Sequence, residues 1–180
     1  LEIQNVSANP VDITGWTIVI NGGYNLTPSI TTQTLSGVMN SGTIQSWDDN
    51  SSSPNYWGQN IMFSPTSGGW VMLLDANGIV VDFVAVALTA VDPFNDVITY
   101  AGNDYPISSM WTGPFVTGTD LTSDALIRQG TSDNNDSSDW LVTETTVPSA
   151  TINSNLSLPF TGCDHTDTLN LTINGSSAGF

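Results

Sequence analysis

Apolar residues recur along this chain in short runs and alternations that are typical of β-strands. Residues 1–5 (LEIQN) alternate and predict a short first strand, and residues 16–20 predict a second one because Val, Ile and Thr suit a pleated surface. No segment keeps a helical period over three turns. The one helical turn we expect lies around residues 93–96.

The clearest single element is a hairpin over residues 70–86. Two apolar runs, residues 71–74 and 79–84, flank the sequence Asp75-Ala76-Asn77-Gly78. An Asn-Gly pair supplies the positive φ angles that a tight chain reversal needs. Because both runs are almost continuously apolar, we expect both strands to be central in a sheet and buried on both faces.

The C-terminal part of the chain differs in composition from the rest. Residues 131–139 form an acidic loop, residues 153–162 read as a polar link, and residues 167–174 alternate as one amphipathic strand. About 25 residues cannot bury a core of their own, so this strand must pair with something. We therefore predict a β-sandwich over residues 1–153, followed by a linker and an isolated strand over residues 154–180.

Charge narrows the possible functions. Lys+Arg is 1 against 17 for Asp+Glu, for a net charge of −16, and the one cation is Arg128. A field this negative repels nucleic acid and anionic lipid, and a chain without lysine has no Schiff-base or P-loop chemistry. No run of 18 apolar residues occurs, so we expect no membrane insertion. The chain begins at Leu1 without a signal peptide, so we expect a processed product or an excised fragment.

Three motifs occur in the order found in lamin-tail domains. They are residues 1–5 (LEIQN) with 10–17 (PVDITGWT), residues 71–82 (VMLLDANGIVVD), and residues 125–128 (ALIR) followed by 133–136 (DNND) and Asp139-Trp140. Residues 1–150 thus resemble the bacterial extracellular type of that family. The resemblance implies an all-β fold, an immunoglobulin-like β-sandwich.

The chain departs from this family at both ends. The strand that usually precedes the first motif is missing, and the usual closing motif is only loosely echoed by residues 147–153. Residues 162–173 (GCDHTDTLNLTI) instead resemble the last strands of extracellular repeat modules in surface proteins of the Bacteroidetes type. Both resemblances imply an extracellular, cell-surface protein.

The missing strand suggests how copies of the chain could assemble. A sandwich that lacks a strand exposes backbone donors and acceptors, and a spare strand with Leu169, Leu171 and Ile173 could fill the gap. If the strand comes from the same chain, the result is a rearranged domain. If it comes from another copy, the result is strand donation and a head-to-tail polymer. The alternative is that both ends are cut from a longer repeat protein.

The acidic loop is the best candidate for a metal site. Asp133, Asn135, Asp136 and Asp139 offer oxygen ligands of the kind that Ca²⁺ prefers, although the EF-hand spacing is absent and such residues also cap turns without a metal. Residues 48–50 are a weaker candidate. We interpret Arg128 as a structural ion pair with Glu2 or a loop aspartate.

Enzyme chemistry is poorly supported by the residues present. His165 is the only histidine and Cys163 the only cysteine, and the two have no third group with them in the sequence. We therefore expect a non-enzymatic structural or adhesive protein, as a subunit of a surface filament built by strand donation. Its partners would be other copies of itself or neighbouring modules. The alternative is a carbohydrate-binding or surface-binding accessory module. We expect the six tryptophans to lie mostly in the core or at its rim, and this alternative would instead need Trp47, Tyr56 and Trp57 exposed for glycan stacking.

Overall fold

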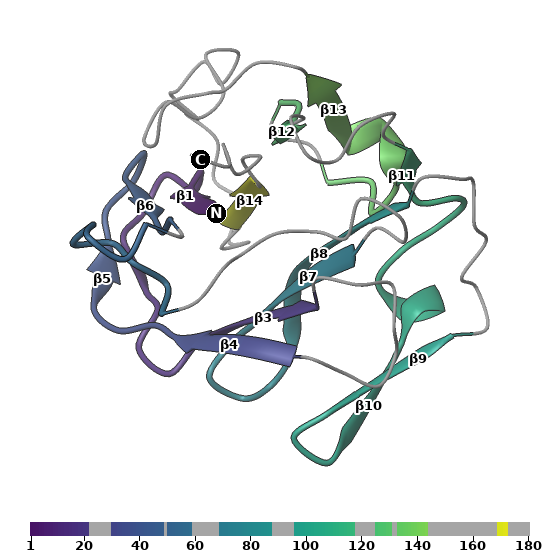
Figure 1. Cartoon of the computed structure of the whole chain (residues 1–180), viewed down its shortest axis with the longest axis horizontal. Coiled ribbons are helices and arrows are strands. Elements are labelled where there is room, and N and C mark those ends of the chain that lie inside the picture. The colour runs from purple at the N-terminus through teal and green to yellow at the C-terminus, as the bar shows by residue number, and fades with distance from the viewer. Residues whose placement is uncertain are drawn as a thin grey trace.

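The structure is a computed structural model that describes residues 1–21, 30–48, 50–58, 69–87, 96–117, 125–130, 133–143 and 169–172. Its elements are β-strands and two short 3-10 turns, η1 (Ile107–Ser109) and η2 (Ser137–Asp139). The strands form several antiparallel or mixed sheets, shown in Figure 1. The prediction of an all-β, sandwich-like fold is therefore confirmed.

The largest sheet has five strands in the order β11-β8-β7-β3-β4. Its centre is the predicted hairpin, which is confirmed: β7 and β8 pair antiparallel, and β7 is buried along its whole length. At one edge β11 pairs parallel with β8, which makes the sheet mixed. The five strands are β3 (Thr17–Asn21), β4 (Ile30–Thr34), β7 (Gly69–Leu74), β8 (Val80–Ala87) and β11 (Val116–Thr117).

An irregularity in the hairpin lies beside its one buried charge. Leu73 is opposite Asp82 whereas Leu74 is opposite Val80, so β8 carries one extra residue, Val81. Such bulges bend a strand and re-aim the side chains next to them. The carboxylate of Asp82 is 2% exposed at this point, in a strand whose other residues are apolar.

A second sheet joins the two ends of the described chain. β1 (Glu2–Asn5) lies between β6 (Ile44–Ser46) and β14 (Leu169–Thr172), and both pairs are antiparallel. Figure 1 shows the yellow β14 directly beside the purple β1. The C-terminal strand expected from the alternating pattern thus exists, and it pairs with β1 of the same chain.

One hydrophobic core connects the sheets. Ile3 of β1, Ile18 of β3 and Trp70 of β7 are all fully buried in it, and Phe83 contributes from β8. Three smaller pairs complete the described part: β2 (Val11–Asp12) with β5 (Val38–Met39), β9 (Val97–Tyr100) with β10 (Asn103–Pro106), and β12 (Ala125–Arg128) with β13 (Trp140–Thr143).

Some sequence predictions fall outside the described residues. The helical turn around residues 93–96 is described only at Asp96, and the polar link 153–162 lies outside, as do Cys163, His165 and Ile173. In the part of the chain that is described, no helix has the length and apolar character needed to cross a membrane.

Candidate functional site

The protein's only cation is held inside the molecule by the pairing of β12 with β13. Arg128 is opposite Trp140 in this pair, and the guanidinium carbon lies 5.3 Å from the centroid of the indole ring. A guanidinium at this distance over an aromatic face gains a cation–π attraction. The Arg128 side chain is 1% exposed, so this charge must be compensated within the protein.

Asp82 of β8 supplies the closest buried counter-charge. The Nη1 nitrogen of Arg128 donates to both oxygens of this carboxylate, at 3.1 and 3.2 Å. The backbone N–H of Phe83 also donates to Asp82 Oδ1 at 2.8 Å. A buried carboxylate with these three hydrogen bonds is well satisfied, which a buried ion pair requires.

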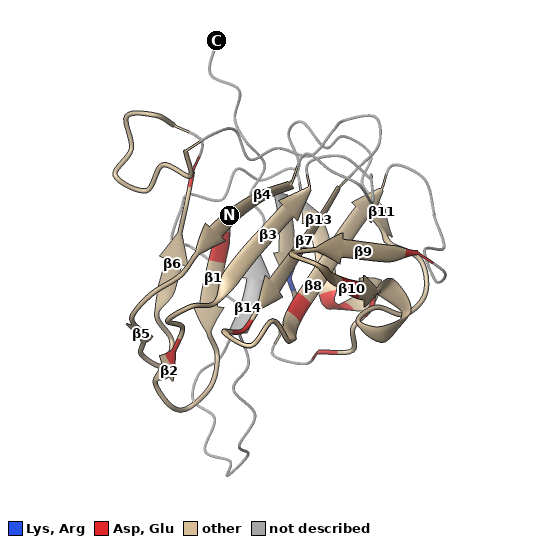
Figure 2. Cartoon of the chain, turned by 90° about the horizontal axis from the view of Figure 1, so that it is seen from below, with Lys and Arg blue, Asp and Glu red and all other residues tan. Residues whose placement is uncertain are grey.

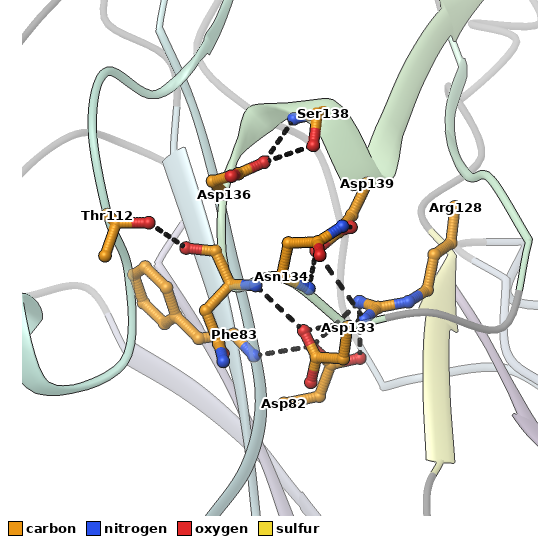
Figure 3. A network of polar contacts seen from close by, with 10 residues as sticks. Asp82, Phe83, Thr112, Arg128, Asp133, Asn134, Asp136, Ser138 and Asp139 are labelled. Carbon is orange, nitrogen blue, oxygen red and sulfur yellow. Dashed lines mark hydrogen bonds and ion pairs between the residues drawn. The ribbon is translucent and has the colours of Figure 1, made fainter.

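The acidic loop supplies two further carboxylates. Asp133 Oδ1 lies 2.8 Å from Arg128 Nη2, and Asp139 Oδ2 lies 3.9 Å from the same nitrogen. Asn134 donates its backbone N–H and its side-chain amide to Asp139 at 2.8 and 2.6 Å, which fixes that carboxylate. Figure 3 shows Asp82, Asp133 and Asp139 gathered around the guanidinium. We call Arg128 and these three aspartates the ion cluster.

Electrostatics within the ion cluster favour the charged arginine. Burial alone lowers the pKa of the Arg128 guanidinium, but the charges of Asp82, Asp133 and Asp139 raise it, and the net pKa lies above its ordinary value. Arg128 is therefore a permanent cation here. It offsets the repulsion among three carboxylates, so its role as a structural ion pair is seen directly in the contacts.

The rest of the acidic loop makes turns. Asp136 caps η2 by accepting from the backbone N–H of Ser138 at 2.7 Å, and Asn135 has a left-handed φ of 54°. The carbonyl of Asn135 accepts from the backbone N–H of Thr112 at 2.7 Å. Figure 3 shows Asp136 directed toward Ser138 and away from Arg128. These contacts tie the loop to the body of the protein.

The predicted calcium ligands are therefore not gathered around one point. Among the described residues, no group of three or more His, Cys, Asp or Glu side chains is arranged to hold a metal ion. At the weaker candidate, Asp48 accepts from Asn50 N–H at 3.0 Å and from Ser53 Oγ at 2.6 Å, and Asp49 lies outside the described residues. Calcium binding by Asp133, Asn135, Asp136 and Asp139 stays a prediction.

The alternative of an exposed aromatic platform is wrong for two of its three residues. Trp47 and Trp57 are buried in the core and meet edge to face, with ring centroids 5.9 Å apart. The indole N–H of Trp57 donates to Thr31 Oγ1 at 3.3 Å. Only Tyr56 is exposed. The burial of Trp47 and Trp57 agrees with the expectation that the tryptophans lie mostly in the core or at its rim, because indoles carry a large apolar area.

The strand-donation residues lie at the edge of β1. Leu169 is opposite Asn5, and Leu171 is opposite Ile3, while Ile173 lies outside the described residues. β14 also contacts β8 and β12, the two strands that carry Asp82 and Arg128. The structure therefore brings together two features that the sequence placed apart, the spare strand and the lone cation.

Sequence reasoning missed Asp82 as a partner of Arg128. The signal was present, because Asp82 is the only charged residue in the apolar run that begins at Ile79. A carboxylate buried in such a strand needs a cation, and this chain has only one. The expected burial of Asp82, together with the single cation in the sequence, was enough to predict that Asp82 pairs with Arg128.

Comparisons with known proteins identify no relative. No protein-family model matches the chain, and neither the curated proteins nor the solved structures give a significant match. The resemblance to lamin-tail domains stays a prediction from the motifs, and function must be argued from the residues themselves.

Proposed function

We propose that this chain is a non-enzymatic structural or adhesive protein that acts outside the cell, as a subunit of a surface filament. The observation that carries the proposal is the ion cluster. The only cation in the chain is fully buried and holds three strands and a loop together, where it is out of reach of a substrate.

The surface composition supports the same proposal. Charged residues are only 10% of the chain, so its polar surface consists mainly of Ser, Thr, Asn, Gln and Gly. This composition is common in secreted and cell-surface β-proteins. Arg128, the only Lys or Arg in the chain, is buried, while Figure 2 shows red acidic segments in several loops and strands. An outer surface without cations disfavours nucleic acid and anionic membrane as partners.

Electron microscopy of the purified protein tests this function. Samples concentrated at physiological ionic strength, with and without EDTA, should contain filaments or regular oligomers. Filaments that dissolve on chelation and return with Ca²⁺ would also support calcium as a cofactor. Single chains under every condition, with no binding to cell surfaces, would contradict the proposal.

Carbohydrate binding is not proposed as a second function. It rested on exposed stacking by Trp47 and Trp57, and both indoles are buried. Tyr56 alone offers one exposed ring in that region, whereas stacking platforms gain affinity from flat, exposed aromatic surface.

A further inference from the structure

The position filled by β14 is a strand seat, which we define as the edge of β1 together with the neighbouring strands β8 and β12. β14 pairs with β1 at four positions: Glu2 with Thr172, Ile3 with Leu171, Gln4 with Asn170 and Asn5 with Leu169. It also contacts β8 and β12. The seat is thus a slot bordered by three strands.

β1 has the burial of an interior strand. Glu2, Ile3, Gln4 and Asn5 are all buried, on both alternating faces of the strand. β6 pairs with the other side of β1, so β14 completes it. If the seat were empty, β1 would become an edge strand that exposes backbone donors and acceptors, which is a template for another strand.

The ion cluster lies beside the seat. Arg128 belongs to β12 and Asp82 to β8, the same two strands that β14 contacts, and Figure 3 shows the yellow β14 next to Arg128. The two side chains are 1% and 2% exposed with the seat filled. A filled seat therefore completes the sheet and lies next to the two strands that carry the buried charges.

We propose that the strand seat is an intermolecular binding site and that its occupant is residues 169–172 of a second copy of this chain. This inference rests on the proposed filament function and names its contact. The second copy carries the same four residues, so the strand makes the same pairs whichever chain supplies it. Exchange of an identical element between copies therefore costs little in contacts.

The length of chain before β14 allows the exchange. Residues 144–168 separate β13 from β14 in the sequence, and a chain of that length can span roughly 80 Å when extended. It can thus reach the seat of a neighbour. Because each copy has one seat and one strand, each copy can donate to the next in a head-to-tail series, which builds an open filament when the rotation between neighbours does not close a ring.

Cysteine pairs across β1 and β14 test the exchange. In a Cys163→Ser background, one batch carries Gln4→Cys and another carries Asn170→Cys, since these two positions are opposite each other in the register. Opposite Cα atoms in antiparallel strands are close enough for a disulfide. The two batches are mixed natively, or unfolded and refolded together, and then oxidised. One batch is isotope-labelled so that mass spectrometry identifies mixed dimers.

The expected result is a dimer that joins one Gln4→Cys chain to one Asn170→Cys chain. Each batch alone should give far less dimer. A mismatched mixture of Gln4→Cys with Thr172→Cys is the control, because a shift of two residues moves the Cα atoms beyond about 7 Å, where a disulfide no longer forms.

Three outcomes would overturn the proposal. In the first, mixtures of the Gln4→Cys and Asn170→Cys batches stay monomeric. A single chain that carries both cysteines forms the disulfide only within itself, which shows that its own β14 fills the seat. In the second, matched and mismatched pairs give equal dimer. In the third, no pair of cysteines forms a crosslink, which would contradict the pairing of β14 with β1 in this register. Microscopy of the same samples separates the two proposals, since filaments without mixed crosslinks would leave the structural function standing and remove strand exchange.

Discussion

At the scale of single residues, replacement of Asp82 should strongly lower the free energy of unfolding. Asp82→Asn removes the closest buried counter-charge of Arg128 and leaves the guanidinium with one partly exposed carboxylate and one at 3.9 Å. Breaking a buried ion pair from one side costs about 3–5 kcal/mol. Urea denaturation of both proteins measures the difference.

Two further variants serve as controls for Asp82→Asn. Asp104→Asn changes an exposed carboxylate that accepts from Thr99 and should cost about 1 kcal/mol or less. The double variant Asp82→Leu/Arg128→Met removes both charges and should recover much of the lost stability. If Asp82→Asn is as stable as Asp104→Asn, the ion cluster does not hold the fold together.

The carboxyl group of Asp75 at the hairpin turn should make the stability of the protein depend on pH. Burial acts to raise the pKa of this carboxyl, but hydrogen bonds from Ile79 and Asn77, each 2.8 Å to the same oxygen, outweigh it and lower the pKa below its ordinary value. Because the folded-state pKa is below the unfolded one, the stabilisation is complete above the unfolded value and is lost as the pH falls through the folded value.

The control variant is Asp75→Asn, whose side-chain amide does not titrate in this pH range. The stability difference between wild type and variant should be constant from about pH 7 to about pH 5 and shrink as the pH falls below about 4. Denaturation midpoints over this range measure it. A difference that stays unchanged down to about pH 2.5 would show that the turn hydrogen bonds do not favour the ionised carboxyl.

At the scale of elements, β14 should be required for a stable second sheet. A chain that ends at Thr168 loses about four backbone hydrogen bonds to β1, each worth about 0.5–1.5 kcal/mol, so its unfolding free energy should fall by roughly 2–6 kcal/mol. A peptide covering residues 167–174 should restore the midpoint, whereas a scrambled peptide of the same composition should not. A truncated chain as stable as the full chain would mean that the strand seat is not needed.

The elements were predictable from the sequence to different degrees. β7, β8 and their Asn-Gly turn have strong local signals, a period and a turn residue, and the hairpin was found where expected. The pairing of β14 with β1 joins residues more than 160 positions apart, and the alternation of Leu169 and Leu171 predicts a strand without naming its neighbour.

The candidate site was only half predictable for a similar reason. The acidic loop suggests a cation, and the sequence cannot distinguish a metal ion from a guanidinium held by another strand. Arg128 and Asp82 are 46 positions apart in the sequence, on β12 and β8, and only the tertiary fold brings the two side chains together. Trp47 and Trp57 were easier to place, since the large apolar area of an indole favours the core, where both side chains lie.

At the scale of the whole molecule, net charge should control assembly. Each copy carries −16, so two copies repel each other at low salt, where the Debye length is about 30 Å at 0.01 M. At 0.15 M it falls to about 8 Å, and mixed crosslinks between copies should form faster. A rate that falls as NaCl is added would contradict this account.

A comparison of two divalent ions distinguishes charge screening from specific calcium binding. CaCl₂ and MgCl₂ at matched ionic strength should accelerate crosslinking equally if they only screen charge. A clear excess with Ca²⁺ would support a calcium site formed by the acidic residues when copies meet. Equal rates would leave screening as the sufficient explanation.

Strand exchange is tested most directly by a cryo-electron microscopy map of the assembled protein in which the chain is traced from β13 to β14. We expect the path to leave Thr143 of one subunit and to place Leu169–Thr172 on β1 of the next subunit, in the register found here. A trace that returns to β1 of its own subunit would contradict assembly by strand exchange.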